Sequence, residues 1–367
     1  MPAWMIYGFA VFSMFFGSGN LVFPINIGVE SAVPWASILG LLISAILIPM
    51  MGLMGVLISG QGIRDYLSPL GKKTAFFLIV MMLLLLGPFG VLPRSLMVAS
   101  GGMSLVFGKI PLPIIGLGMV LMGHSLALSQ NMIRWIGQYF TPLILLGLFA
   151  IIAGICFLPL SINHAHSGQF WDAFSTGFQT MDLIAALFFA RALSSAFIKQ
   201  YPTTHHSQIL WAASFGFFCL LVVYSLMVLV SYQLSDQLQE VASEKRIVTI
   251  SSLILGDHAK IVSGFVIASA CMTTYAVLLK EFIQFFSEYC PRWSMHQLAF
   301  VVSVISYMGS FMGFDQLAAV IGFILHIVYP ALILFVVLRH FDLLQRAMYA
   351  GVFYVCIALN MMTLFIF

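Results

Sequence analysis

Two glycines, a serine and an asparagine interrupt an apolar run near the start of the chain, in MFFGSGNLVFPINIG from Met14 to Gly28. Gly17 and Gly19 make helix costly at the centre of this run, and Pro24 cannot donate the backbone bond that a continuing helix requires, so two half-helices are predicted. The N–H groups at a half-helix end attract a carboxylate, and carbonyls at the opposite end favour a cation. The pattern is typical of a site for an amino acid and its coupling ion. The alternative is a glycine-kinked helix that serves only packing.

A second interruption occurs in STGFQTMDLIAALFFA, from Ser175 to Ala190. The polar or flexible residues within this apolar segment are Gly177, Gln179, Thr180 and Asp182. Backbone that leaves the helix at membrane depth is tolerated only where protein or a wet cavity satisfies it. Each interrupted segment is the first of a predicted set of five helices, which is where transporters with inverted repeats place their discontinuous helices. The corresponding breaks favour transport over packing alone.

Asp182 and Arg94 are ionisable residues inside predicted spans, and each is a functional candidate because burying a charge in lipid is expensive. They could pair with each other or gate the outer pathway. For Arg94 the alternative is a side chain that snorkels at the outer end of its span. For Asp182 the alternative is a cap on the second half of its helix.

The alternative hypothesis from a different functional class is that the protein is an enzyme. MGHSLA, from Met122 to Ala127, lacks the second glycine of the G-x-S-x-G motif, and with His326 as base it would describe an intramembrane serine protease. That hypothesis leaves the paired interruptions unexplained, so we predict no enzyme. A channel would need a continuous polar stripe, which the sequence lacks. Four histidines fall in two joints on opposite membrane faces and predict no metal site: His164, His166, His205 and His206.

Composition places the chain in a membrane. Charged residues are 7% and hydrophobic residues 62% of 367 positions, against roughly one-quarter charged in a soluble domain. The net charge of +3 comes without a basic cluster, so no nucleic-acid partner is expected. The five cysteines are scattered singly and are interpreted as packing residues.

Polar and Gly/Pro-rich joints divide the chain into eleven predicted spans, centred near Phe16, Ile46, Leu86, Met119, Leu148, Ala186, Val222, Cys271, Val304, Leu325 and Val355. The first span carries no Lys or Arg and continues past any cleavage site, so it is expected to be retained. Most Lys and Arg residues fall in loops on the same side of the membrane as the N-terminus. The positive-inside rule therefore places the N-terminus in the cytoplasm. The polar segment from Gln233 to Lys260 lies on the outer side and predicts either a short helical cap or a plain solvated loop.

Four stretches resemble the branched-chain amino acid:cation symporter family (BrnQ-type, LIVCS) of the amino acid–polyamine–organocation superfamily. In family order they are FGSGNLVFP (16–24), GPFGVLPR (87–94), GFQTMDLIAAL (177–187) and ACMTTYAVLLKEF (270–282). The resemblance implies an all-α polytopic membrane protein with the LeuT-like 5+5 inverted repeat and discontinuous helices one and six. Residues 1–367 would form one transporter domain, with repeat one at about 4–160, repeat two at about 173–338 and an extra helix at about 346–366. Family members usually have twelve spans, and this sequence ends after about eleven, which leaves the last peripheral helix in doubt.

The resemblance also implies a sodium site between the first and eighth helices. Thr273 and Thr274 offer two hydroxyl ligands, and backbone carbonyls would come from Ala270, Ser13 and Phe16. Adjacent threonines that bond only to their own helix are the alternative.

The implied substrate site lies between the two interrupted helices. N–H groups for the carboxylate would come from Gly17, Ser18 and Gly19, while Asn20 would stabilise the unwound turn or touch the ion. The opposite wall, with carbonyls for the ammonium group, would be Gln179, Thr180, Met181 and Asp182. Neighbouring apolar side chains would select leucine, isoleucine, valine or methionine over charged substrates.

We therefore expect a multi-pass inner-membrane symporter that imports a branched-chain or similar neutral aliphatic amino acid with Na⁺ by alternating access, with Arg94 as a gating candidate. Coupling to H⁺, or transport of another neutral amino acid, is the alternative within the same fold. No further cofactor is expected. The sequence predicts neither the preferred aliphatic substrate nor the oligomeric state.

Overall fold

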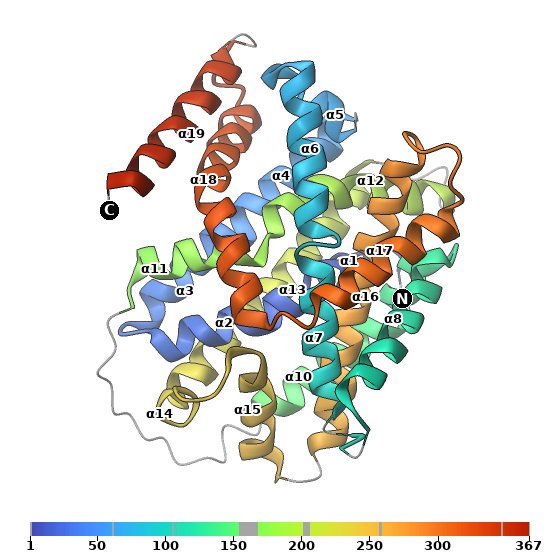
Figure 1. Cartoon of the computed structure of the whole chain (residues 1–367). Helices are drawn as coiled ribbons and strands as arrows, with labels where there is room; N and C mark the ends of the chain where they lie inside the picture. The colour runs from blue at the N-terminus through green and yellow to red at the C-terminus, as the bar shows by residue number, and fades with distance from the viewer. Residues whose placement is uncertain are drawn as a thin grey trace.

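The computed structural model describes residues 2–60, 62–104, 106–108, 110–153, 168–200, 206–256, 259–345 and 348–366 (Figure 1). Within these ranges the chain is helical apart from loops and one isolated bridge between Ser31 and Gly168. Among the described residues, seven helices are long and apolar enough to cross a membrane, or eight spans are present if one bent pair of helices counts as a span. Three shorter apolar helices correspond to predicted spans four, nine and eleven. The all-helical multi-spanning architecture is confirmed, and the number eleven stays a prediction.

The first half of the chain contains the bent pair and four further predicted spans. The bent pair is α1 (Ala3–Phe15) and α2 (Ser18–Glu30). The second span comprises α3 (Pro34–Leu42), the π-helix η1 (Ile43–Leu47) and α4 (Ile48–Ser59), and the third comprises α6 (Lys72–Leu86) and α7 (Val91–Ser104). They are followed by α8 (Leu112–Leu128), then α9 (Met132–Trp135), η3 (Ile136–Phe140) and α10 (Thr141–Ala153). The short α5 (Ile63–Tyr66) joins the second span to the third.

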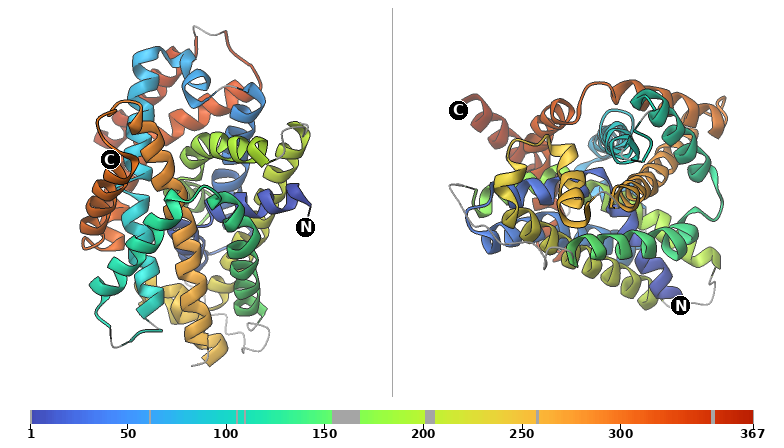
Figure 2. Two further views of the ribbon diagram at one scale, coloured as in Figure 1. Left: turned by 90° about the vertical axis from the view of Figure 1, so that its right-hand side faces the viewer. Right: turned by 90° about the horizontal axis from the view of Figure 1, so that it is seen from below.

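The second half begins with the other interrupted span, formed by α11 (Phe170–Thr176), η5 (Gly177–Thr180) and α12 (Asp182–Gln200). The later spans are α13 (His206–Gln233), α16 (Ala259–Ser287), α17 (Met295–Gly309), α18 (Phe314–His340) and α19 (Met348–Ile366). α16 lies beside α7, α1 lies beside α13, and α12 lies beside α4 (Figure 2). Segments far apart in the sequence thus enclose the two interruptions. The repeat boundaries expected from the sequence stay predictions.

The first span breaks at Phe16 and Gly17, and its two helices meet at an angle of 68°. A β-carbon on Gly17 would lie 2.7 Å from the hydroxyl oxygen of Thr274, so only glycine allows α16 to approach this closely. Pro24 behaves differently from the expectation, because α2 continues through it to Glu30. The glycine segment, and not the proline, therefore sets the break.

The sixth span breaks at Met181, which has a left-handed backbone with φ of 59°. Gly177, which the sequence marks as a breaking residue, instead provides space, because a β-carbon there would lie 2.0 Å from the hydroxyl oxygen of Ser44. A third interruption, which we did not predict, separates α6 from α7 at Gly87–Gly90 within one of the seven long apolar spans. A β-carbon on Gly90 would lie 1.9 Å from the carbonyl oxygen of Leu85, so this turn also requires glycine.

The polar segment between α13 and α16 forms a helical cap and not a plain loop. It contains α14 (Ser235–Leu238), the 3-10 helix η6 (Ser243–Lys245) and α15 (Arg246–Leu255) (Figure 1). Arg246 donates from Nη1 to Oδ1 of Asn26 on α2 at 2.8 Å, and from Nε to the carbonyl of Val241 at 3.1 Å. Partial burial lowers the pKa of Arg246, and the nearby carboxylates Glu30 and Asp315 oppose that shift. The cap is therefore attached by a polar contact to the second half of the first span.

Candidate functional site

A buried polar network joins the two interrupted spans. Asn20 on α2 donates from Nδ2 to both carboxylate oxygens of Asp182, at 2.8 Å each. The hydroxyl of Tyr224 on α13 contacts Asn20 and donates to Oδ2 of Asp182 at 3.2 Å. Asp182 is 1% exposed, so its charge lies among neutral partners in the protein interior. This network fixes the amino end of α2 against the amino end of α12.

Asp182 is the first residue of α12, yet its observed partners are side chains of other helices. The amide of the next residue, Leu183, instead donates to the hydroxyl of Tyr329 on α18 at 3.0 Å. The hydroxyl of Thr180 accepts from the Asp182 amide at 3.4 Å. The carboxylate is thus directed toward α2 and α13, and the capping alternative does not describe its contacts.

A small cavity lies at the two interruptions. Its volume is about 10 Å³, about enough for one water molecule, whereas small-molecule sites are typically about 300–1,000 Å³. Six of the predicted substrate-site residues line it: Gly17, Ser18, Gly19, Asn20, Thr180 and Asp182. The first backbone bond of α2 runs from Leu21 to Gly17 at 3.0 Å, so the amides of residues 18–20 are the donors that a helix start leaves without intrahelical partners. The Gly17 amide, which was also predicted to meet a carboxylate, instead donates to the carbonyl of Phe15. The walls must separate before an amino acid fits.

Two predicted members of the wall lie outside this cavity. The side chain of Gln179 lies near Gly322 on α18. The backbone carbonyl of Gln179 accepts a hydrogen bond from Arg94. Met181 is fully buried at the left-handed turn. These residues therefore shape the interruption without lining the cavity.

The predicted ion ligands Ser13, Ala270, Thr273 and Thr274 come together where α1 ends against α16. The carbonyl of Ser13 accepts from Thr274 at 3.2 Å and from Thr273 at 3.3 Å. The Ser13 hydroxyl also donates to Thr273 at 3.0 Å, and the Thr273 hydroxyl is 2.9 Å from the carbonyl of Ala270. All four are buried. This arrangement concentrates hydroxyl and carbonyl oxygens, the donor type that a hard cation prefers.

The helix end explains why the Ser13 carbonyl is available. In a continuing helix it would accept from the amide of Gly17, but that amide donates to the carbonyl of Phe15 at 2.8 Å. The fifth predicted ligand, Phe16, is fully buried, and its ring stacks on Phe12 with centroids 4.9 Å apart. Among the contacts of the described residues, none joins the Phe16 carbonyl to the threonine hydroxyls.

Arg94 is 1% exposed, so it does not snorkel to the surface. Its Nη1 donates to the carbonyl of Gln179 at 3.2 Å, and the guanidinium lies 5.6 Å from the ring centroid of Phe23 and 5.9 Å from that of Phe314. Its Nε is buried without a hydrogen-bond partner. The ion pairs found in the described part of the chain do not join Arg94 to Asp182.

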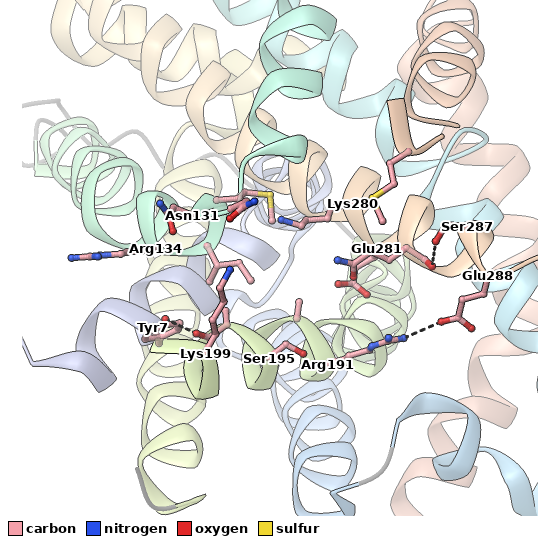
Figure 3. Close-up of a pocket in the computed structure, with 17 residues that line it drawn as sticks. Tyr7, Asn131, Arg134, Arg191, Ser195, Lys199, Lys280, Glu281, Ser287 and Glu288 are labelled. Atoms are coloured by element: carbon pink, nitrogen blue, oxygen red, sulfur yellow. Dashed lines mark hydrogen bonds and ion pairs between the residues drawn. The ribbon is translucent and has the colours of Figure 1, made fainter. Parts of the chain in front are cut away.

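A larger cavity of about 720 Å³ is lined by residues of α1, α9, α12 and α16 (Figure 3). Its charged lining residues are Arg134, Arg191, Lys199, Lys280, Glu281 and Glu288. Glu288 accepts from Arg64 on α5 at 2.7 Å and lies 3.8 Å from Arg191. We did not predict this cavity, although the ionisable residues near the ends of spans six and eight were a usable signal.

The protease alternative finds no support in the geometry. The Ser125 hydroxyl donates to the carbonyl of Met122 in its own helix at 2.8 Å. Nδ1 of His326 lies 2.7 Å from the carbonyl of Gly322 in its own helix. Residues 164, 166 and 205 and the side chain of His206 lie outside the described residues, within which no histidine, cysteine or carboxylate group is arranged to hold a metal ion.

An all-helical membrane fold with two spans interrupted around buried polar groups is the architecture of the LeuT-like fold class. The structure is similar to a nucleobase-cation-symport-1 family transporter solved in a closed conformation with bromovinylhydantoin bound, with a TM-score of 0.64 and 12% identity over 97% of this chain and 91% of that chain. It is also similar to a variant of the manganese transporter of Eremococcus coleocola, with a TM-score of 0.62 and 14% identity over 98% and 86%. At these identities the likeness concerns the fold.

Sequence comparison identifies the family within this class. The family of branched-chain amino acid transport proteins matches residues 2–365, and the chain belongs to it. Proteins named as branched-chain amino acid carriers in Staphylococcus saprophyticus and Staphylococcus aureus are 27% identical to it, over 91% of this chain and 80% or 81% of theirs. The sequence-based resemblance is confirmed, and the protein is a multi-pass membrane transporter and not an enzyme.

Proposed function

We propose that the protein is a sodium-coupled symporter that imports leucine, isoleucine, valine or a similar neutral aliphatic amino acid across the inner membrane. The main observation that supports this proposal is the group of oxygens from Ser13, Thr273 and Thr274 at the break of the first span. This group lies next to the network that Asn20 and Asp182 form. The names of the staphylococcal relatives support a branched-chain substrate. The excess of Lys and Arg in the joints on one side supports a cytoplasmic N-terminus.

Sodium would occupy the space where hydroxyl hydrogens now join the threonines to the Ser13 carbonyl. The alternative ion is the proton, for which Asp182 is a buried carboxylate acceptor. Coupling requires that ion and substrate bind the same state cooperatively, typically with a coupling free energy of about 1–3 kcal/mol. The adjacency of the two groups of residues on α1, α2 and α16 gives a direct physical route for such cooperativity.

The conformation fits an inward-facing step of alternating access in this orientation. The larger cavity would open to the cytoplasm through α1, α12 and α16, while the substrate cavity is contracted. On the outer side Arg94 lies against Phe23 and Phe314, and Arg246 of the cap contacts Asn26. We infer that separation of these contacts opens the outer pathway, with Arg94 as part of the gate.

Uptake into proteoliposomes tests the proposal. Labelled leucine, isoleucine, valine and methionine are offered under a sodium gradient, under a pH gradient, and with neither. Concentrative uptake driven by sodium alone is expected. Uptake that follows the pH gradient without sodium would establish the proton alternative, and equal uptake without any gradient would contradict symport. Lysine serves as the control substrate, because its second charge has no partner among the apolar walls.

A further inference from the structure

We propose that Arg94 and Asp182 are the two charged poles of the substrate site, Arg94 for the α-carboxylate and Asp182 for the α-ammonium group of a free amino acid. This proposal rests on the proposed transport of amino acids and deepens it. It assigns recognition of the zwitterion to side-chain charges on α7 and α12, in addition to backbone groups of the interrupted helices.

Within the described residues, neither Arg94 nor Asp182 forms an ion pair. Both residues are 1% exposed. Arg94 contacts one carbonyl and two aromatic rings, and its Nε is left without a partner. The carboxylate of Asp182 is contacted by the neutral side chains of Asn20 and Tyr224. A charge in a membrane interior is expensive unless it is paired, so both groups require a function that explains them.

The two charges also face the same short stretch of α2. The Asp182 carboxylate accepts a hydrogen bond from Asn20. The guanidinium of Arg94 lies over the ring of Phe23, about one turn further along α2. Arg94 likewise bonds to the carbonyl of Gln179, on the segment that leads into Asp182. One small molecule bearing both charges can therefore approach the two groups together, once the contracted cavity opens.

The amino end of α2 contacts the helices that carry both residues, through Asn20 to Asp182 on α12 and through Ser18 to α7. The Ser18 hydroxyl is 3.3 Å from the hydroxyl of Ser95, the residue that follows Arg94. A carboxylate bound here would meet the free amides at the start of α2 and the unpaired Nε of Arg94 together, which are charge-assisted contacts. An ammonium group on the same α-carbon would be directed toward Asp182, where it can replace Asn20 as a donor.

Binding of the two charged groups by Arg94 and Asp182 predicts a specific selectivity. A ligand that lacks the carboxylate leaves Arg94 buried and unpaired, and a ligand that lacks the ammonium group leaves Asp182 buried and unpaired. Leucinamide has the ammonium group without the carboxylate, and 4-methylpentanoate has the carboxylate without the ammonium group. Both keep the leucine side chain. We expect each to bind the unaltered protein about ten- to a hundredfold more weakly than leucine, the range for loss of a charge-assisted contact.

The test is calorimetric binding of leucine, leucinamide and 4-methylpentanoate to the purified full chain in nanodiscs, with sodium present. Asp182→Asn should weaken leucine and leucinamide about ten- to a hundredfold and leave 4-methylpentanoate unchanged or tighter. Arg94→Gln should weaken leucine and 4-methylpentanoate and spare leucinamide. Asp236→Asn, at an exposed position of the cap, and Arg339→Gln, at the end of α18, are the matched controls.

A purely structural role for either charge predicts that its removal weakens all three ligands by one common factor, and that outcome overturns the proposal. Asp182→Glu and Arg94→Lys keep the charges, so they should retain the order of the three affinities even where folding or packing lowers all of them. Failure of the unaltered protein to bind leucine would instead refute the proposed function. Leucine binding with equal losses across the three ligands would refute this assignment alone.

Discussion

Replacement of Thr274 by alanine is the sharpest probe of the proposed ion site. Its hydroxyl contacts the Ser13 carbonyl on α1, and the residue is 4% exposed, so the substitution removes one oxygen from a region closed to bulk water. A hydrogen bond or ligand contact that involves a charge contributes typically about 1.5–3 kcal/mol. Since about 1.4 kcal/mol is a tenfold change in binding, the half-saturating sodium concentration should rise roughly ten- to a hundredfold.

Thr273→Ala should act in the same direction with a smaller effect. The Thr273 hydroxyl also bonds to the carbonyl of Ala270 in its own helix at 2.9 Å, so part of its contact energy does not depend on the ion. Serine at either position keeps the hydroxyl and should preserve the sodium response.

The assay is leucine uptake at a fixed substrate concentration while sodium is varied. Thr249→Ala is the matched control, because the Thr249 hydroxyl on α15 donates to the carbonyl of Lys245, the residue just before its own helix. Sodium curves for Thr273→Ala and Thr274→Ala that overlay the curve of the unaltered protein would show that these hydroxyls only pack against the end of α1.

Three further predictions concern glycines and the substrate carboxylate. Gly19→Leu should abolish leucine binding while the protein still inserts, because an added β-carbon already lies 3.4 Å from both Phe23 and Thr180; unchanged affinity by calorimetry would contradict this. Leucine methyl ester should bind poorly to the unaltered protein, since it lacks the carboxylate, and ester affinity equal to that of leucine would make the broken helix a packing device. Gly137→Ala should lower stability by about 1–3 kcal/mol through overpacking, because its β-carbon would lie 2.0 Å from the carbonyl of Ile6. Thermal unfolding in detergent measures this against Gly118→Ala, where nothing lies within 4 Å.

The sequence allowed prediction of the two corresponding breaks because glycine and polar residues are conspicuous in segments that otherwise favour helix. It also indicated that Ser13 and the two threonines would meet, although that expectation came from the family resemblance. Pro24 misled the prediction, because it lies in the interior of α2 and the helix continues through it. Helices inside membrane proteins tolerate such a proline where neighbouring groups satisfy the backbone carbonyl that loses its partner. Met181 gave no signal, because a left-handed backbone at a nonglycine residue is imposed by packing around it.

Long-range packing decided the remaining features. Arg94 could snorkel or become buried according to the sequence, and the rings of Phe23 and Phe314, far apart in the chain, settle its burial. The orientation of Gln179 away from the cavity likewise depends on α18. The residues of the break at Gly87–Gly90 belong to the family-like stretch GPFGVLPR. An apolar span with two glycines is also compatible with a continuous helix packed closely against a neighbour, so the stretch did not predict the break.

The charged lining of the larger cavity has a kinetic consequence for the transport cycle. Four cationic side chains face two carboxylates there, so the local potential is positive. In the sodium-coupled cycle proposed above, a cation released from the oxygens at Ser13 into this cavity would be repelled by its walls and would rebind less often, while the carboxylate of a departing amino acid would be attracted to them. The field cannot alter the overall driving force, which the gradients fix. If the proposed sodium coupling is correct, this field would favour release of the ion before release of the amino acid, and raised ionic strength on that side should weaken the preference.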